Sequence, residues 1–227
     1  MLVVNKPAGL LAVPGRGADK QDCLSARIQQ EFPDALIVHR LDMATSGLLV
    51  FARGAEMQRR LSRLFREREV EKRYVAVVAG KVEPANIQSP ISPALLQMER
   101  ERSPLLPLGE GWEGGWGEVN LPIVADWPNR PRQKVNFVVG KSSLTRYRVL
   151  AHDAVMNTSR VELEPVTGRT HQLRVHMAAI GHPILGDVLY GGEASSGAER
   201  LLLHARALSF PHPLSEAPLT LVCEAPF

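Results

Sequence analysis

The 227-residue sequence predicts an α+β fold built on a mixed β-sheet. Two observations support this class. Segments with the composition or alternation of β-strands outnumber the segments with a helical pattern. The two kinds of segment also alternate irregularly along the chain, whereas a doubly wound α/β fold would alternate them regularly.

Three segments have the apolar spacing of amphipathic helices. Over residues 22–32, apolar residues recur every fourth position, Asp22 can cap the start and Pro33 ends the pattern. A second helix is expected at about 55–67, with its apolar side chains on one face. A third is expected from Thr170 to about Ile180.

The predicted strands are short and bounded by Gly, Pro or polar residues. Residues 48–52 are continuously apolar, which predicts a buried strand. The full set of expected strands is 2–5, 47–53, 73–79, 134–139, 144–151, 158–164, 201–209 and 219–224, and residues 36–38 lead into the loop that carries Asp42.

Residues 85–116 interrupt this pattern. They are rich in Pro and Gly and show no periodicity, so we expect a surface insertion within a single domain that spans 1–227. Gly109, Gly111 and Gly114 satisfy G-x-G-x-x-G, but no strand leads into them and no helix follows. A nucleotide cofactor site is therefore not expected.

Composition limits the class of protein. The hydrophobic content of 44% and charged content of 22% are ordinary for a globular chain. A net charge of +3 neither requires nor excludes nucleic-acid binding. The two cysteines form no metal-ligand pattern, and no apolar run reaches the ~20 residues that cross a bilayer. With no signal peptide evident, we expect a cytoplasmic protein with no membrane partner.

The segment 38–47 is the strongest candidate for a functional loop. Asp42 lies between an Arg-Leu pair and Thr45-Ser46-Gly47, directly before the buried strand. This predicts a carboxylate on a short loop at the mouth of a sheet, where catalytic side chains are commonly presented. The ordinary alternative is a turn-forming or ion-paired aspartate.

Basic residues gather on and just after the second predicted helix. Two interpretations remain open: a solvated helix face with ion pairs, or contacts to phosphate groups. The basic residues are Arg59, Arg60, Arg63, Arg66, Arg68, Lys72 and Arg73, against the acids Glu67, Glu69 and Glu71.

The loop resembles the signature of a known enzyme family. His39-Arg40-Leu41-Asp42 followed by Thr45-Ser46-Gly47 is similar to the motif of the RluA-type pseudouridine synthases. Further segments resemble that family in its order, namely Val4–Pro7, Lys72–Val75, Gly168–His176, Gly181–Asp187 and Leu203–Ala205. Residues 126–131 and 133–135 look like the branch that modifies both large-subunit rRNA and tRNA.

The resemblance implies a bent, largely antiparallel sheet with flanking helices and loops, and an active cleft across its middle. Relative to the family pattern, about thirty residues are inserted within 85–116. Many members carry a small RNA-binding domain ahead of the segment that matches residues 4–7, and we expect none here.

The resemblance makes Asp42 the catalytic nucleophile. Conversion of uridine to pseudouridine breaks a C–N glycosidic bond and makes a C–C bond, so it needs no metal, redox cofactor or nucleoside triphosphate. A carboxylate is ionised at neutral pH and is ready for this role. The sequence does not determine whether Asp42 attacks C1′, attacks C6 or removes a sugar proton.

Three further residues are expected to bind the substrate. Arg174 would orient Asp42 by a bidentate contact, although a helix-surface arginine is the ordinary alternative. By resemblance Tyr74 stacks on the target base and takes part in C5 deprotonation, and its alternative is a core aromatic. By resemblance Arg40 fills the gap left by the extruded nucleotide, and its alternative is an ion pair with Asp42.

The histidines do not predict a metal site. His171 and His176 are five residues apart, about 140° around a helix, so they would not converge on one ion. We expect no cofactor, and structured RNA, namely rRNA and tRNA stem-loops, as the partner of a monomer.

Two other functions remain open. A catalytically silent RNA-binding protein could keep the same fold. A glycoside or nucleoside hydrolase would need a second catalytic acid near Asp42, and the sequence supplies no obvious one.

Overall fold

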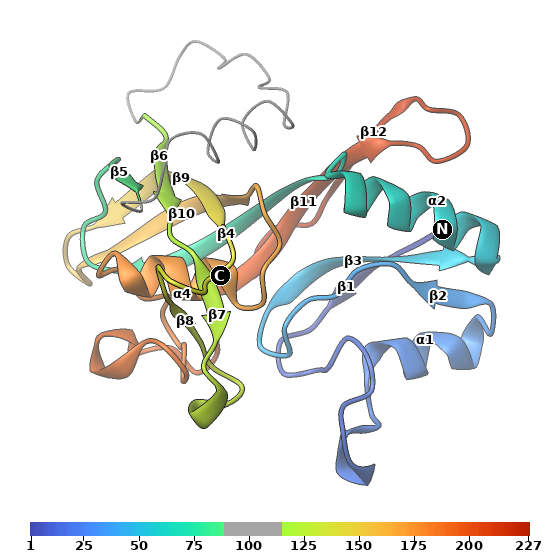
Figure 1. Cartoon of the computed structure of the whole chain (residues 1–227), viewed down its shortest axis with the longest axis horizontal. Coiled ribbons are helices and arrows are strands. Elements are labelled where there is room, and N and C mark those ends of the chain that lie inside the picture. The colour runs from blue at the N-terminus through green and yellow to red at the C-terminus, as the bar shows by residue number, and fades with distance from the viewer. Residues whose placement is uncertain (89–114) are drawn as a thin grey trace.

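One large sheet organises the described part of the molecule. The structure is a computed structural model that describes residues 1–88 and 115–227. Ten strands of these residues form a sheet in the order β1-β3-β11-β4-β10-β9-β6-β5, with β2 beside β3 and β12 beside β11 (Figure 1). They are β1 (Leu2–Lys6), β2 (Ala35–Ile37), β3 (Ser46–Arg53), β4 (Glu71–Ala79), β5 (Asn86–Gln88), β6 (Gly117–Asn120), β9 (Leu144–Asp153), β10 (Thr158–Pro165), β11 (Leu203–Pro211) and β12 (Pro218–Val222).

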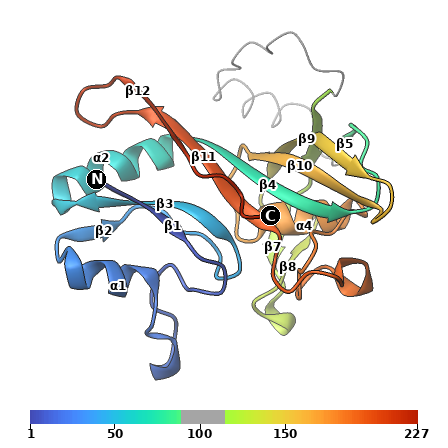
Figure 2. The ribbon, with the colours of Figure 1, turned by 180° about the vertical axis from the view of Figure 1, so that it is seen from behind.

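The sheet is mixed but mostly antiparallel. Only β3–β11 and β5–β6 run parallel among the pairs in the two described ranges. Seen from behind, β4 and β11 run side by side across the middle of the molecule (Figure 2). The predicted α+β class, with a mostly antiparallel central sheet, is confirmed.

The strand after the Asp42 loop is buried on both faces because helices cover both. Every second residue from Leu48 to Ala52 packs with α2 (Gly54–Glu67), while the two residues between them pack on the side of α1 (Leu24–Glu31). Burial of each larger apolar side chain stabilises the fold by about 1.5–3 kcal/mol. The continuous apolar run therefore fixes β3 firmly, and with it the end of the loop that carries Asp42.

The three helices lie close to their predicted positions. α1 begins later than expected because Cys23, not Asp22, is its N-cap residue. The carboxylate of Asp22 instead pairs with Arg27 at 2.7 Å, so the predicted cap is wrong. The third helix, α4 (Gln172–Ala179), packs its Leu173 against the core formed by β4, β9 and β10. In the described ranges, two 3₁₀ turns lie outside the hairpin described next, at Ala18–Lys20 (η1) and Gly192–Ser195 (η3).

A separate hairpin precedes β9. It consists of β7 (Ile123–Ala125) and β8 (Gln133–Val135), with the 3₁₀ turn η2 (Trp127–Asn129) at its tip. The strand predicted over 134–139 is wrong beyond Val135. There, the side chain of Asn136 accepts hydrogen bonds from two backbone N–H groups that follow it, and the chain turns.

The predicted insertion at 85–116 lies mostly outside the described residues, because 89–114 are not described. Its described start was wrongly assigned to a surface excursion. Asn86–Gln88 forms β5 and pairs in parallel with β6 at the edge of the sheet. Short strands rich in Asn, Gln and Gly carry little strand propensity, which explains why β5 and β6 were missed. The organisation of 1–227 as one domain stays a prediction.

The group of strands β1, β2 and β3 pairs with the rest of the sheet over only a short length. In the described part of the chain this pairing consists of two residue pairs, Ser46–His204 and Gly47–Ala205. Gly47 has φ 113°, and a Cβ there would collide with the backbone of Ala205. Glycine is therefore required where the two strands approach.

No helix in the two described ranges is long and apolar enough to span a membrane.

Candidate active site

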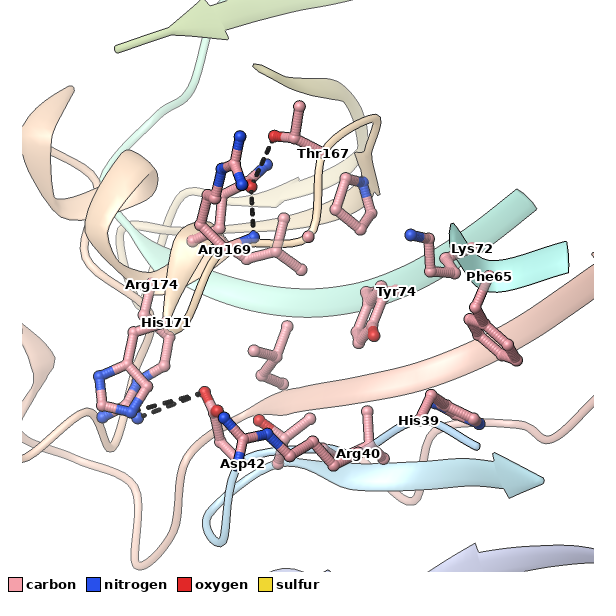
Figure 3. Close-up of a pocket in the computed structure, with 17 residues that line it drawn as sticks. His39, Arg40, Asp42, Phe65, Lys72, Tyr74, Thr167, Arg169, His171 and Arg174 are labelled. Atoms are coloured by element: carbon pink, nitrogen blue, oxygen red, sulfur yellow. Dashed lines mark hydrogen bonds and ion pairs between the residues drawn. The ribbon is translucent and has the colours of Figure 1, made fainter. Parts of the chain in front are cut away.

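A pocket of about 310 Å³ lies across the sheet beside the Asp42 loop (Figure 3). Its walls come from the loop after β2, the C-terminal part of α2, the start of β4 and the segment that leads into α4. Two ends can be distinguished. The Asp42 end contains Asp42, His171 and Arg174, and the Lys72 end contains His39, Phe65 and Lys72.

A buried lysine holds the Asp42 loop. The backbone N–H of Thr45 donates to the carbonyl of Asp42 at 3.1 Å, which closes a turn. Lys6 donates from Nζ to three backbone carbonyls, including that of Met43 at 2.9 Å. Burial lowers the pKa of Lys6 to about 8, although the charge of Asp42 opposes this shift. Lys6 was not predicted as part of the site, and the only signal for it is its place in the matched segment Val4–Pro7.

Arg174 approaches Asp42 but has another principal partner. Its Nε and Nη2 donate to the two carboxylate oxygens of Asp187 at 2.7 and 2.6 Å. Its Nη1 lies 3.8 Å from Oδ2 of Asp42. The predicted bidentate contact with Asp42 is therefore wrong, because Asp187 occupies that geometry. Burial lowers the pKa of Arg174, but the hydrogen bonds and charge of Asp187 outweigh this and raise it.

His171 completes the Asp42 end. Its Nε2 lies 3.9 Å from Oδ2 of Asp42, and its Nδ1 lies 2.6 Å from the hydroxyl of Tyr190. Burial lowers the pKa of His171, and Arg174 lowers it further, while Asp42 and Asp187 act in the opposite direction. Neither Tyr190 nor Asp187 was predicted to support the site, since no local pattern links them to Asp42.

Tyr74 lies on β4 between the two ends of the pocket (Figure 3). It packs against the hydrophobic cores on both sides of the β3–β11 pairing. Burial raises the pKa of its phenol, and the charge of Asp42 adds to the effect. The phenol therefore stays protonated at neutral pH. The predicted substrate role and the core alternative are both compatible with this position.

Arg40 is exposed at the pocket wall. The described residues offer it no hydrogen bond or ion pair, so the alternative of an ion pair with Asp42 is not observed. Asp42, by contrast, is the single carboxylate among the described residues that line the pocket. A hydrolase that works with two carboxylates would lack its second acid here.

The comparisons with known proteins decide the family. Residues 1–179 match the family model described as RNA pseudouridylate synthase. The chain belongs to the RNA pseudouridylate synthase family. It is therefore an isomerase that acts on RNA, and the resemblance seen in the sequence is confirmed.

Curated relatives cover the whole chain of this pseudouridine synthase. The chain is 46% identical over 228 residues to the dual-specificity RNA pseudouridine synthase RluA of Yersinia pestis, covering 100% of this chain and 96% of the relative. Identity to the protein of that name from Haemophilus influenzae is 42% over 228 residues, with 100% and 90% covered.

Solved structures agree with the fold. Human RNA pseudouridylate synthase domain containing 1 superimposes with a TM-score of 0.70 at 27% identity, covering 99% of this chain and 80% of that one. Human RNA pseudouridylate synthase domain containing 4 gives a TM-score of 0.66 at 25% identity, with 99% and 85% covered.

His176 and the arginines of α2 have partners outside the pocket. His176 contacts Thr145 and the carbonyl of Leu121, away from His171. Within the described ranges, no three His, Cys, Asp or Glu side chains are grouped so as to hold a metal.

On α2, the arginines at 59, 60, 63 and 66 form exposed ion pairs with Glu56 or Glu67. The ion-paired interpretation of this helix is observed, and a phosphate-binding role remains a prediction.

Proposed function

We propose that this pseudouridine synthase isomerises specific uridines in stem-loops of both 23S rRNA and tRNA, as a cytoplasmic monomer. The curated relatives named dual-specificity RNA pseudouridine synthase support the choice of substrates. So does the hairpin tip within the matched segment 126–135. Trp127 is 65% exposed there, and the guanidinium of Arg130 lies 3.3 Å from the centre of its ring. An exposed aromatic ring paired with a cation suits contact with unpaired bases.

The charge of the pocket carries the proposal. One carboxylate, that of Asp42, faces a pocket whose other charged lining residues are cations, namely Arg40, Lys72, Arg169 and Arg174. Cations favour a phosphate backbone, while the lone carboxylate is placed to react with the nucleoside. A binding module has no need for a partly exposed carboxylate in a pocket whose other charged residues are basic.

The reaction requires the target uridine to leave the RNA stack and enter the pocket. The C1′–N1 bond breaks, the uracil turns, and a C1′–C5 bond forms. N1 gains a proton and C5 loses one, so the process is an isomerisation without a co-reactant. Asp42 acts as the nucleophile that divides this exchange into two steps, and the guanidinium of Arg174 faces its carboxylate at 3.8 Å.

Tyr74 and Arg40 hold the extruded nucleotide. The ring of Tyr74 gives the uracil a stacking surface beside Asp42. Because its phenol is held protonated, stacking and hydrogen-bond donation are favoured over removal of the C5 proton. Arg40 is exposed and without a partner in the described residues, so its guanidinium is available to fill the space that the flipped base vacates.

The test uses two RNAs and three proteins. A uridine-containing anticodon stem-loop and an rRNA hairpin are incubated with the wild type, Asp42→Asn and the control Asp34→Asn, and pseudouridine is mapped. Asp34 is an exposed carboxylate paired with Arg53, outside the pocket. Conversion of both RNAs by wild type and control, but not by Asp42→Asn, supports the proposal.

Other outcomes would overturn it in distinct ways. Conversion of one RNA alone would reject dual specificity. Binding without conversion by any of the proteins would indicate a silent RNA-binding protein. Release of free uracil would indicate a hydrolase.

A further inference from the structure

A chain of polar contacts leads from the β7–β8 hairpin to Asp42. The backbone N–H of Gln133 donates to the hydroxyl of Tyr190 at 2.8 Å. The same hydroxyl lies 2.6 Å from Nδ1 of His171. Since the phenol oxygen already accepts from Gln133, its own proton remains to be donated, and the described residues provide Nδ1 as its acceptor. A neutral His171 therefore carries its proton on Nε2.

That proton is on the nitrogen that faces Asp42. Nε2 of His171 and Nη1 of Arg174 approach the same carboxylate oxygen, Oδ2, at 3.9 and 3.8 Å (Figure 3). Contacts of this length are common in catalytic sites without substrate and shorten when the substrate binds.

The imidazole is held in orientation from several sides. His171 adopts a left-handed backbone conformation, φ 54° and ψ 17°, at the residue that begins α4. A residue other than glycine or asparagine rarely adopts this conformation unless its surroundings impose it. The ring meets that of Tyr190 edge-on at 5.6 Å, and the guanidinium of Arg174 lies 5.1 Å from the Tyr190 ring. Two backbone N–H groups, those of Leu189 and Tyr190, donate to Asp187 and fix this loop.

We propose that His171 is a positioning residue for the nucleophile: its neutral imidazole donates from Nε2 to Oδ2 of Asp42, so that Oδ1 faces the uridine, and Tyr190 sets the tautomer. This inference rests on the proposed function. The charged groups that face His171 are Asp42, Asp187 and Arg174. Burial and Arg174 favour the neutral form of the imidazole, which the proposal requires.

The first test replaces the imidazole. His171→Ala removes the donor, and the single-turnover rate of pseudouridine formation should fall by about 100-fold, the scale expected when a reacting group is misplaced by about 1 Å. His171→Gln restores an N–H donor near the position of Nε2 and should recover part of that loss. RNA affinity should stay within about twofold in both variants. His182→Ala is the matched control, because His182 is half-buried and bonded to a backbone carbonyl outside the pocket.

The second test removes only the tautomer-setting hydroxyl. Tyr190→Phe should lower the rate and also move the acid limb of the pH–rate profile to higher pH. The hydroxyl bonds to the neutral form of His171, so its loss lets the pKa of His171 rise. Tyr147→Phe is the matched control, since that buried hydroxyl also accepts from a backbone N–H, that of Ala85 at 3.0 Å, away from the pocket.

The results separate this inference from the proposed function. A wild type without pseudouridine formation on either RNA would defeat the proposed function itself. An active wild type with equally active His171→Ala would defeat only the role of His171. A rate loss in Tyr190→Phe that is equal at all pH values, or matched by Tyr147→Phe, would reduce Tyr190 to a structural residue.

Discussion

The Asp42 end and the Lys72 end of the pocket differ in how their charges are satisfied. At the Asp42 end, the buried guanidinium of Arg174 donates two hydrogen bonds to Asp187 and lies 3.8 Å from the carboxylate of Asp42. At the Lys72 end, Nζ of Lys72 forms no hydrogen bond or ion pair with a described residue, beside the stacked rings of His39 and Phe65. The first end is organised before the substrate arrives, and the second holds a cation that a phosphate can satisfy.

The largest effect is expected at the nucleophile. Asp42→Asn should lower the rate of pseudouridine formation by about 10⁴-fold or more, because a neutral, weakly nucleophilic amide replaces the carboxylate. Its contacts to Arg174 and His171 are long, 3.8 and 3.9 Å, so the free energy of unfolding should change by no more than about 1 kcal/mol. Single-turnover assays and urea unfolding measure the two effects. Residual activity above about one hundredth of wild type would contradict the nucleophile assignment.

For Asp187, the other carboxylate that contacts Arg174, the large effect is expected on stability rather than on the reaction rate. Asp187 is 2% exposed, and Asp187→Asn would leave the guanidinium buried without its counter-charge. The free energy of unfolding should fall by about 3–5 kcal/mol. Asp34→Asn, which breaks the exposed pair with Arg53, should cost at most about 1 kcal/mol. Equal losses in the two variants would show that the Arg174–Asp187 pair contributes no special stability.

Two histidines that are neutral at pH 7, His39 at the Lys72 end of the pocket and His176 on α4, predict an effect of pH on stability. Burial lowers the pKa of His39 to about 3 and that of His176, on α4, to about 4. The unfolded chain binds these protons near pH 6.5, so stability is lost as the pH falls below that value. Between pH 7 and pH 5 each should cost about 2 kcal/mol of unfolding free energy. Urea unfolding at pH 7 and pH 5 measures the combined loss of unfolding free energy. An NMR titration that shows either histidine of the folded protein protonating near pH 6.5 would refute the contribution of that histidine.

The smallest effect is expected at the Lys72 end. Lys72→Gln should weaken RNA binding by about tenfold, as expected for one charged contact, and should reduce the salt dependence of binding by about one unit of slope. The single-turnover rate on saturating RNA should be unchanged. Lys81→Gln, whose ammonium pairs with exposed Glu83 outside the pocket, is the control. An unchanged salt slope for Lys72→Gln would exclude a phosphate contact.

The sequence was most informative where local pattern and chemistry coincide. The apolar run before Arg53 predicted β3, and Asp42, Tyr74 and Arg174 were predicted to line one site, which the structure brings together in one pocket. Their chemical roles remain predictions. The partner of Arg174 was not predictable, since Asp187 lies thirteen residues away and reaches the guanidinium only through the tertiary fold.

Local sequence pattern did not predict features that depend on contacts between residues far apart in the sequence or on very short strands. Lys6 reaches under the Asp42 loop to a carbonyl 37 residues away, and no local pattern indicates this beyond its place in the matched segment Val4–Pro7. β6 forms because β9 offers a neighbour for pairing, and the edge strand β5 pairs in turn with β6. Strand propensity does not include such long-range pairing.

The narrow pairing of β3 with β11 has a mechanical consequence. Asp42 is attached to β3 on one side of it, and Arg174 and His171 belong to the side built on β4, β9 and β10. β11 and Tyr74 of β4 pack with the cores on both sides of this pairing, so the position of Asp42 relative to Arg174 depends on how the strands pack around Gly47 and Ala205. A larger residue at position 47 would collide with the backbone of Ala205 and push the two strands apart, which would displace Asp42 from Arg174 and His171.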